Sequence, residues 1–307
     1  MLLDNLNFRT LMKDKIKINN DFDTLAPLSE NHPDKKVLSF INNSKFLDIL
    51  YSNKDISCLI CTKEIYEILK EEYLKSNKIG IIISENPKDT FFKIQNYLVK
   101  ETEFYFKNFS NIISNKAKIH PTAVVEDKNI IIEDGVEIGA STIIYSNTVI
   151  KKNCRIGANC IIGGESFSFN NFNKIYAGGR VILEENVELL GNNSIERGIY
   201  RDTVIKENTK ISYGSIIEHD VEIGKNTLIC ANVTITGRVK AGDNCYFGPG
   251  SVIRNGLEIE SNGRANMGAV VTKNIKENEH VSGNFATEHK KYLKVLKYLL
   301  DEVKNEL

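Results

Sequence analysis

Residues 199–241 read IYRDTVIKENTKISYGSIIEHDVEIGKNTLICANVTITGRVKA and return an aliphatic residue at every sixth position. The same spacing holds earlier, from Ile132 to Ile162, and later, up to Val271. A fixed short period of this kind marks a solenoid. Six residues do not fit an α-helical repeat, because 3.6 residues per turn would spread the apolar positions around the helix. The period instead predicts a short strand and a turn, with three such sides closing one coil.

We therefore predict a mainly β fold, with a parallel β-helix over residues 119–276 whose aliphatic side chains stack inside a triangular prism. A β-sandwich is disfavoured, because its strands and loops vary in length. The spacing slips after Ile162, and the glycine-, asparagine- and aromatic-rich segment 163–180 is predicted to be a loop inserted at one corner. Solenoids often place binding insertions on one face, so Phe167 and Phe169 are candidate substrate-binding residues.

The two flanks lack the six-residue spacing. In residues 1–110, strand-like runs at 37–41, 56–61 and 79–84 alternate with amphipathic helical stretches, which predicts a small α/β domain. Residues 288–307 carry apolar residues at helical spacing and predict a C-terminal helix. A lone amphipathic helix needs a partner for its apolar stripe, and we expect packing between subunits.

Composition limits the classes of function. The formal net charge is zero, so no basic excess points to nucleic acid as a partner. The N-terminus lacks an apolar run long enough for a signal peptide or a membrane span, which predicts a cytoplasmic protein. Cys58 and Cys61 form a C-x-x-C, but no second pair or nearby histidine completes a zinc set. We predict that both thiols are buried.

The regular coils contain one histidine, His219, two residues after the inward-facing Ile217. Imidazole suits general-base work because its unperturbed pKa lies near neutral pH, although most isolated surface histidines have no catalytic role. Asp220 follows His219, and Asp202 lies one coil earlier. Either could orient the imidazole or hold a substrate, and aspartate is also common in turns. Gly237 lies one coil after His219, so its N–H is a candidate oxyanion donor.

Four segments carry a family resemblance: LSFINNSKF at 38–46, IHPTAVV at 119–125, SIERGIYRDTVI at 194–205 and IIEHDVEIGKN at 216–226. With them, the chain resembles the UDP-3-O-acylglucosamine N-acyltransferases, enzymes of the lipid A pathway of Gram-negative bacteria. The resemblance implies a left-handed β-helix and a homotrimer with active sites in the clefts between neighbouring β-helices. It also implies that His219 is the catalytic base.

In that family an aromatic residue, an asparagine and a second aromatic bind the uridine, and Phe40, Asn43 and Phe46 fall on these positions. The family's second histidine lies in an N-G-H segment, where this chain has Gly256. GAVVTKNI at 268–275 is similar to the terminal coil of hexapeptide acetyltransferases that use coenzyme A. The resemblance therefore leaves the donor open between acyl-CoA and an acyl carrier protein.

The predicted function is N-acyl transfer from a thioester to the amine of a UDP- or dTDP-linked amino sugar. The product would serve lipid A or another bacterial surface glycan, and no metal is expected to take part. The alternative is a non-catalytic β-helix scaffold or a metal protein similar to carbonic anhydrase. A metal site would need several histidines converging at a subunit interface.

Overall fold

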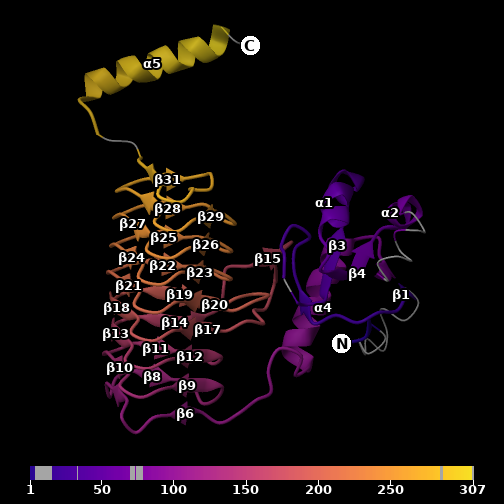
Figure 1. Cartoon of the computed structure of the whole chain (residues 1–307), viewed down its shortest axis with the longest axis horizontal. Coiled ribbons are helices and arrows are strands. Elements are labelled where there is room, and N and C mark those ends of the chain that lie inside the picture. Colours follow the sequence, from indigo (N-terminus) through magenta and orange to yellow (C-terminus); the bar gives the residue numbers. More distant parts are fainter. Residues whose placement is uncertain (4–15, 33, 70–72, 74–78, 284–285, 306–307) are drawn as a thin grey trace.

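The protein is described as a computed structural model of the 307-residue chain, covering residues 1–3, 16–32, 34–69, 73, 79–283 and 286–305. Figure 1 shows an N-terminal domain beside a long β-helix, with helix α5 (His289–Asn305) extending away from the last coil. The predicted C-terminal helix is confirmed within the described residues, and its last two residues, 306 and 307, lie outside them.

The N-terminal domain is the predicted α/β unit. Its five-stranded sheet has the order β1-β5-β4-β3-β2, with β1 antiparallel to β5 and the other pairs parallel. The strands are β1 (Ile16–Ile18), β2 (Thr24–Leu25), β3 (Val37–Ile41), β4 (Ile56–Cys61) and β5 (Gly80–Ile83). The helices are η3 (Ser44–Phe46), α1 (Leu47–Ser52), α2 (Lys63–Ile68) and α4 (Pro87–Glu101). The apolar face of α4 packs on β3 and β4 and closes one core.

The β-helix consists of three parallel sheets, one for each side of the prism. Sheet 1 contains β7 (Lys118–Ile119), β10 (Glu137–Ile138), β13 (Arg155–Ala158), β18 (Glu188–Gly191), β21 (Lys210–Ile211), β24 (Leu228–Ile229), β27 (Tyr246–Phe247), β30 (Arg264–Ala265) and β32 (His280–Val281). Sheet 2 contains β8 (Val124–Val125), β11 (Ile143–Ile144), β14 (Ile161–Gly164), β19 (Ser194–Glu196), β22 (Ile216–Ile217), β25 (Thr234–Ile235), β28 (Val252–Ile253) and β31 (Val270–Val271). Sheet 3 contains β6 (Ile112–Ile113), β9 (Ile130–Ile132), β12 (Thr148–Ile150), β17 (Val181–Leu183), β20 (Thr203–Ile205), β23 (Glu222–Ile223), β26 (Lys240–Ala241) and β29 (Glu258–Ile259).

The aliphatic residues at spacing six fill the prism, as the sequence predicts for a left-handed parallel β-helix. They are buried: Ile205, Ile211, Ile217, Ile223, Ile229 and Ile235 are all at most 2% exposed. The stack begins at β6 and ends at β32, so it extends beyond the predicted limits 119–276 at both ends. At the N-terminal end the six-residue spacing itself continues backward through Val125, Ile119 and Ile113, after one extra residue between Ile132 and Val125, and at the C-terminal end β32 pairs in parallel with β30 through backbone groups.

The corners of the prism turn through the left-handed backbone region. Asparagine takes this conformation at many corners, as at Asn226 and Asn244, because its short side chain lowers the steric cost. One column of corners has Asn129 and Asn147 in its early coils and then changes, with Asp220 at φ 58°, Arg238 at φ 64° and Gly256 at φ 74° on successive coils. This column lies between sheets 2 and 3 and carries the candidate site.

Candidate functional site

His219 sits at the end of β22, and Asp220 turns the chain behind it. The Asp220 side chain is 1% exposed, and its Oδ2 lies 2.8 Å from His219 Nδ1. Its Oδ1 accepts hydrogen bonds from the backbone N–H groups of Tyr200 and Arg201, both at 3.0 Å. Three polar contacts therefore fix this carboxylate, and the carboxylate in turn fixes the imidazole through Nδ1.

Gly237 lies against the other nitrogen of the imidazole. A Cβ added at Gly237 would lie 2.5 Å from His219 Nε2 and 2.6 Å from its Cε1, so a side chain there would collide with the ring. The Gly237 N–H donates to Glu218 Oε2 at 2.9 Å. The predicted stacking of Gly237 beside His219 is therefore present, but the N–H predicted to bind an oxyanion is occupied by Glu218 in this structure.

Asp202 is engaged elsewhere. Its Oδ2 accepts from the Arg180 guanidinium at 2.7 and 3.1 Å, and its Oδ1 accepts from the Arg180 backbone N–H at 2.9 Å. The sequence left Asp202 and Asp220 as equal candidates to orient the imidazole. The structure assigns that contact to Asp220, while Asp202 holds the end of the inserted loop.

Two carboxylates that the sequence reasoning missed border His219. Glu196 ends β19, and the pairing of β19 with β22 places it one coil below Glu218. Burial raises the pKa of Glu196 to about 7, and the nearby charge of Glu218 adds to this effect. The sequence did contain a signal, because each glutamate directly follows an inward isoleucine, so the two acidic side chains stack on one outer wall.

The inserted loop forms a hairpin of β15 (Phe169–Asn170) and β16 (Asn173–Lys174). Phe167 is 90% exposed and Phe169 47% exposed, with their ring centroids 5.2 Å apart. Asn96 of α4 anchors the loop, because its Nδ2 donates to the Lys174 carbonyl at 2.7 Å and its Oδ1 accepts from the Tyr176 N–H at 2.8 Å. The two predicted substrate-binding aromatics are thus exposed on a loop that is tied to the N-terminal domain.

The predicted nucleotide-binding residues lie at the end of β3. Phe40 is half-buried against Phe91 and Phe92 of α4, with centroid distances of 4.9 and 6.3 Å. Asn43 Oδ1 caps η3 by accepting the backbone N–H two residues on, and Phe46 is 40% exposed. Phe46 and Asn43 can therefore meet a ligand at the surface, whereas Phe40 also belongs to the packing of the domain.

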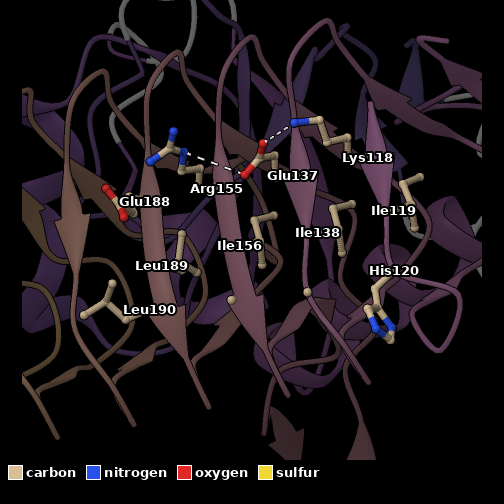
Figure 2. Close-up of a pocket in the computed structure, with 12 residues that line it drawn as sticks. Lys118, Ile119, His120, Glu137, Ile138, Arg155, Ile156, Glu188, Leu189 and Leu190 are labelled. Atoms are coloured by element: carbon tan, nitrogen blue, oxygen red, sulfur yellow. Dashed lines mark hydrogen bonds and ion pairs between the residues drawn. The ribbon is translucent and has the colours of Figure 1, made fainter. Parts of the chain in front are cut away.

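A groove of about 510 Å³ crosses the first coils of sheet 1, away from His219. Figure 2 shows Lys118 and Arg155 directed toward Glu137 along one rim, with His120 on the opposite side. Lys118 Nζ lies 2.9 Å and Arg155 Nε 3.9 Å from the Glu137 carboxylate. These charges satisfy one another, and neither His219 nor Asp220 lines this groove.

Cys58 and Cys61 are buried on β4, as predicted. Within the described ranges, no group of three or more His, Cys, Asp or Glu side chains could hold a metal ion. None of the helices in the described part of the chain has both the length and the apolar character needed to cross a membrane.

Comparison with known proteins agrees with this architecture. The bacterial transferase hexapeptide (six repeats) family model matches residues 129–164 and 202–237, and the hexapeptide repeat of succinyl-transferase model matches residues 238–273. The chain therefore carries transferase hexapeptide repeats over residues 129–164 and 202–273. Curated relatives carry the name UDP-3-O-acylglucosamine N-acyltransferase, which confirms the resemblance seen in the motifs.

The relative from Hahella chejuensis is 32% identical over 162 residues, covering 52% of this chain and 44% of the relative, so less than half of that protein's length is matched. The relative from Helicobacter pylori (strain ATCC 700392 / 26695) is 26% identical over 261 residues, covering 76% of this chain and 74% of its own length. A solved structure of LpxA from Acinetobacter baumannii is 22% identical, with a TM-score of 0.44, covering 57% of this chain and 70% of that one.

Proposed function

We propose that this hexapeptide-repeat protein transfers an acyl group from a thioester to the amine of a nucleotide-linked amino sugar, with His219 as the general base. The observation that carries the proposal is the His219–Asp220 pair, whose Nδ1 contact of 2.8 Å leaves Nε2 to meet a substrate beside Gly237. The names of the curated relatives support acyl transfer to a nucleotide-linked glucosamine.

In the proposed step, His219 Nε2 removes a proton from the sugar amine as its nitrogen attacks the thioester carbonyl. A C–N bond forms, the C–S bond then breaks, and the thiol leaves with a proton returned by the imidazolium. Asp220 stabilises the imidazolium through Nδ1. The carbonyl oxygen needs a donor as it gains charge, and Gly237 N–H can serve only if the Glu218 carboxylate rotates away from it.

The nucleotide is assigned to the N-terminal domain, where Phe46 and Asn43 are at the surface. Aromatic stacking on a base is sequence-tolerant, so the amide of Asn43 would supply the selectivity. Phe46→Ala should raise KM for the nucleotide sugar several-fold without lowering the melting temperature. It is a cleaner variant than Phe40→Ala, because Phe40 also packs on Phe91. An unchanged KM for Phe46→Ala contradicts this assignment.

The protein is proposed to act as a homotrimer. Along sheet 2 most outward positions are aliphatic, with Val124, Ile161, Ile216, Val252 and Val270 between 37% and 69% exposed, and Ser194 and Thr234 interrupt the row. An exposed, mainly apolar row of this kind is typical of a protein interface. Ile216 lies on β22, three residues before His219, so a neighbouring subunit that covers this row would border the catalytic corner and complete a cleft.

Light scattering tests the trimer directly. Ile216→Arg should reduce the particle to a monomer, because it places a charge inside the proposed contact. Glu258→Arg, which puts the same side chain at an exposed position on sheet 3, should leave the trimer intact. A wild-type protein that is monomeric at micromolar concentration contradicts the proposal.

The decisive assay offers a panel of UDP- and dTDP-linked amino sugars with acyl-CoA donors and with an acyl carrier protein. Transfer that depends on the sugar amine supports the proposal, and the preferred donor separates a short-acyl coenzyme A enzyme from a carrier-protein enzyme. No transfer to any acceptor by a folded trimer would leave the scaffold alternative.

A further inference from the structure

The N-terminal domain contributes a charged residue to the surroundings of the His219–Asp220 pair. Glu30 lies in the loop between β2 and β3, and its side chain is 14% exposed. Its Oε2 lies 3.4 Å from an Arg201 guanidinium nitrogen, and its Oε1 lies 3.3 Å from one of Arg238. Two arginines of the β-helix therefore meet one carboxylate of the other domain.

Both arginines also bind the backbone of the catalytic pair. Arg201 Nε and one of its terminal nitrogens donate to the Asp220 carbonyl at 3.0 and 2.8 Å. The backbone N–H of Arg238 donates to the His219 carbonyl at 2.9 Å. The chain of contacts thus runs without a gap from Glu30, through each arginine, to the residues that carry the base.

Hydrogen bonds within the N-terminal domain hold the loop that carries Glu30. Asn53 Nδ2 donates to the carbonyls of Leu28 and Glu30, both at 2.9 Å, and the His32 N–H donates to Asp55 at 2.8 Å. Glu30 therefore stands on a loop that the N-terminal domain itself fixes.

The corner at Arg238 is a second, independent sign of a built contact. Arg238 takes φ 64°, a conformation that costs energy for a long side chain and that many other corners give to asparagine or glycine. The arginine retains this strained position while its guanidinium reaches Glu30 and Asn255 Oδ1, the latter at 2.7 Å.

We propose that Glu30 is a positioning residue for the His219–Asp220 pair, acting across the domain interface through Arg201 and Arg238. The inference rests on the proposed role of His219 as base. Burial alone raises the pKa of Glu30, but contacts with His32, Arg201 and Arg238 together hold it below its usual value, so the carboxylate is charged at neutral pH. Its charge balances the two guanidiniums that would otherwise oppose formation of the imidazolium at His219.

Two variants should move the acidic limb of the kcat/KM profile, which the proposal attributes to His219, in opposite directions. Glu30→Gln keeps the shape but removes a negative charge, so the imidazolium becomes less favourable and the acidic limb of the kcat/KM profile moves to lower pH. Arg238→Asn removes a positive charge, so that limb moves to higher pH. We expect a shift of about half a pH unit in each case and, for Glu30→Gln, a fall in kcat on the order of ten-fold. Glu196 and Glu218, which also face His219, are unchanged in both variants.

The matched control is Asn96→Ala, which loosens a neutral contact between the two domains. A merely structural role for Glu30 predicts that Glu30→Gln and Asn96→Ala both raise KM or lower the melting temperature without moving the acidic limb. Opposite shifts for Glu30→Gln and Arg238→Asn, with none for Asn96→Ala, support the proposal. Unshifted profiles in both charged variants overturn it.

Titration of the His219 imidazole by NMR in the trimer, with ¹³C-labelled histidine, gives the same test without an assay. The His219 signal is assigned from its loss in His219→Gln. Its midpoint should fall in Glu30→Gln and rise in Arg238→Asn. If His219→Ala keeps full activity while these midpoints move, the proposed base is wrong and the charge coupling holds; if His219→Ala is inactive and the midpoints stay fixed, only the role of Glu30 fails.

Discussion

Ile217 and His219 lie two residues apart in the chain, but they belong to regions with different physical demands. Ile217 points into the prism, is fully buried, and is stacked between Ile195 and Ile235 of the adjacent coils. His219 points outward at a corner where residues of the N-terminal domain and the inserted loop approach. In the interior an apolar side chain recurs in every coil, so this region stabilises the fold. At this column of corners the residue changes from coil to coil, from Asp220 to Arg238 to Gly256, so a single coil can carry chemistry there.

The sharpest test of this comparison is His219→Ala. Removal of a positioned general base typically costs about 10²–10⁴ in rate, so kcat should fall by that order. The proposed trimer and the melting temperature should stay near wild type, because His219 lies outside the apolar core of the prism. A variant that keeps more than about a third of wild-type kcat places the base elsewhere, and Asp202 and Asp220 are then the next residues to replace.

The interior should respond in the opposite way. Ile217→Ala leaves a cavity in a close-packed column and should lower the free energy of unfolding by about 2–5 kcal/mol. Chemical denaturation measures this loss. The fraction that stays folded should keep most of its kcat, because Ile217 touches no reacting group. A variant with wild-type stability would mean that the interior is not close-packed at this coil.

The sequence predicted the interior more completely than the corner. The inward isoleucines repeat locally, so their spacing alone identifies the prism and its coils. His219 was found because it is the one histidine within the uninterrupted six-residue spacing, although the structure also places His120 and His280 in the stack. The contact of Glu30 with Arg201 spans 171 residues and depends on how two domains dock, which no local pattern encodes. The stacking of Glu196 and Glu218 does follow from a local pattern, because each glutamate comes directly after an inward isoleucine.

Gly237→Ala tests the corner without touching its charges. The added methyl would lie 2.5 Å from His219 Nε2, so the imidazole must move and its contact with Asp220 must lengthen. We expect a loss of kcat of about ten- to hundred-fold, smaller than for removal of the base. Gly214→Ala is a stringent control for folding, because its added methyl would lie 2.5 Å from Asn232 Oδ1 on a different edge of the prism and its φ of 73° adds backbone strain. Equal losses of activity in both variants would show that the effect is one of folding.

The smallest expected effect concerns Glu196. This residue lies at the corner, but we expect it to change the free energy of unfolding rather than the activity. The folded-state pKa of Glu196 is raised to about 7, mainly by burial, whereas the unfolded chain has the ordinary value. The folded state therefore binds the Glu196 proton more tightly than the unfolded chain does. The stability that the bound proton adds is fully present below the unfolded pKa, and it is lost as the pH rises through the folded pKa of about 7. Since Glu196 is partly exposed, we expect the pH-dependent change in the free energy of unfolding to be about 1 kcal/mol. This is less than a full conversion of the pKa shift into free energy would give.

Glu196→Gln cannot lose that proton, so the variant should gain stability relative to wild type as pH is raised from about 5 to 8. Denaturation curves at a series of pH values measure the difference, and the exposed carboxyl of Glu67, changed to Gln, is the control. A difference between Glu196→Gln and wild type that stays constant across this range would mean that Glu196 is charged at the corner like an ordinary surface glutamate. Glu196 and Glu218 would then both be negatively charged beside His219 at every pH where the enzyme works. A difference that grows with pH means that Glu196 is protonated and neutral at the lower pH values, so that its negative charge beside Glu218 appears only as the pH rises.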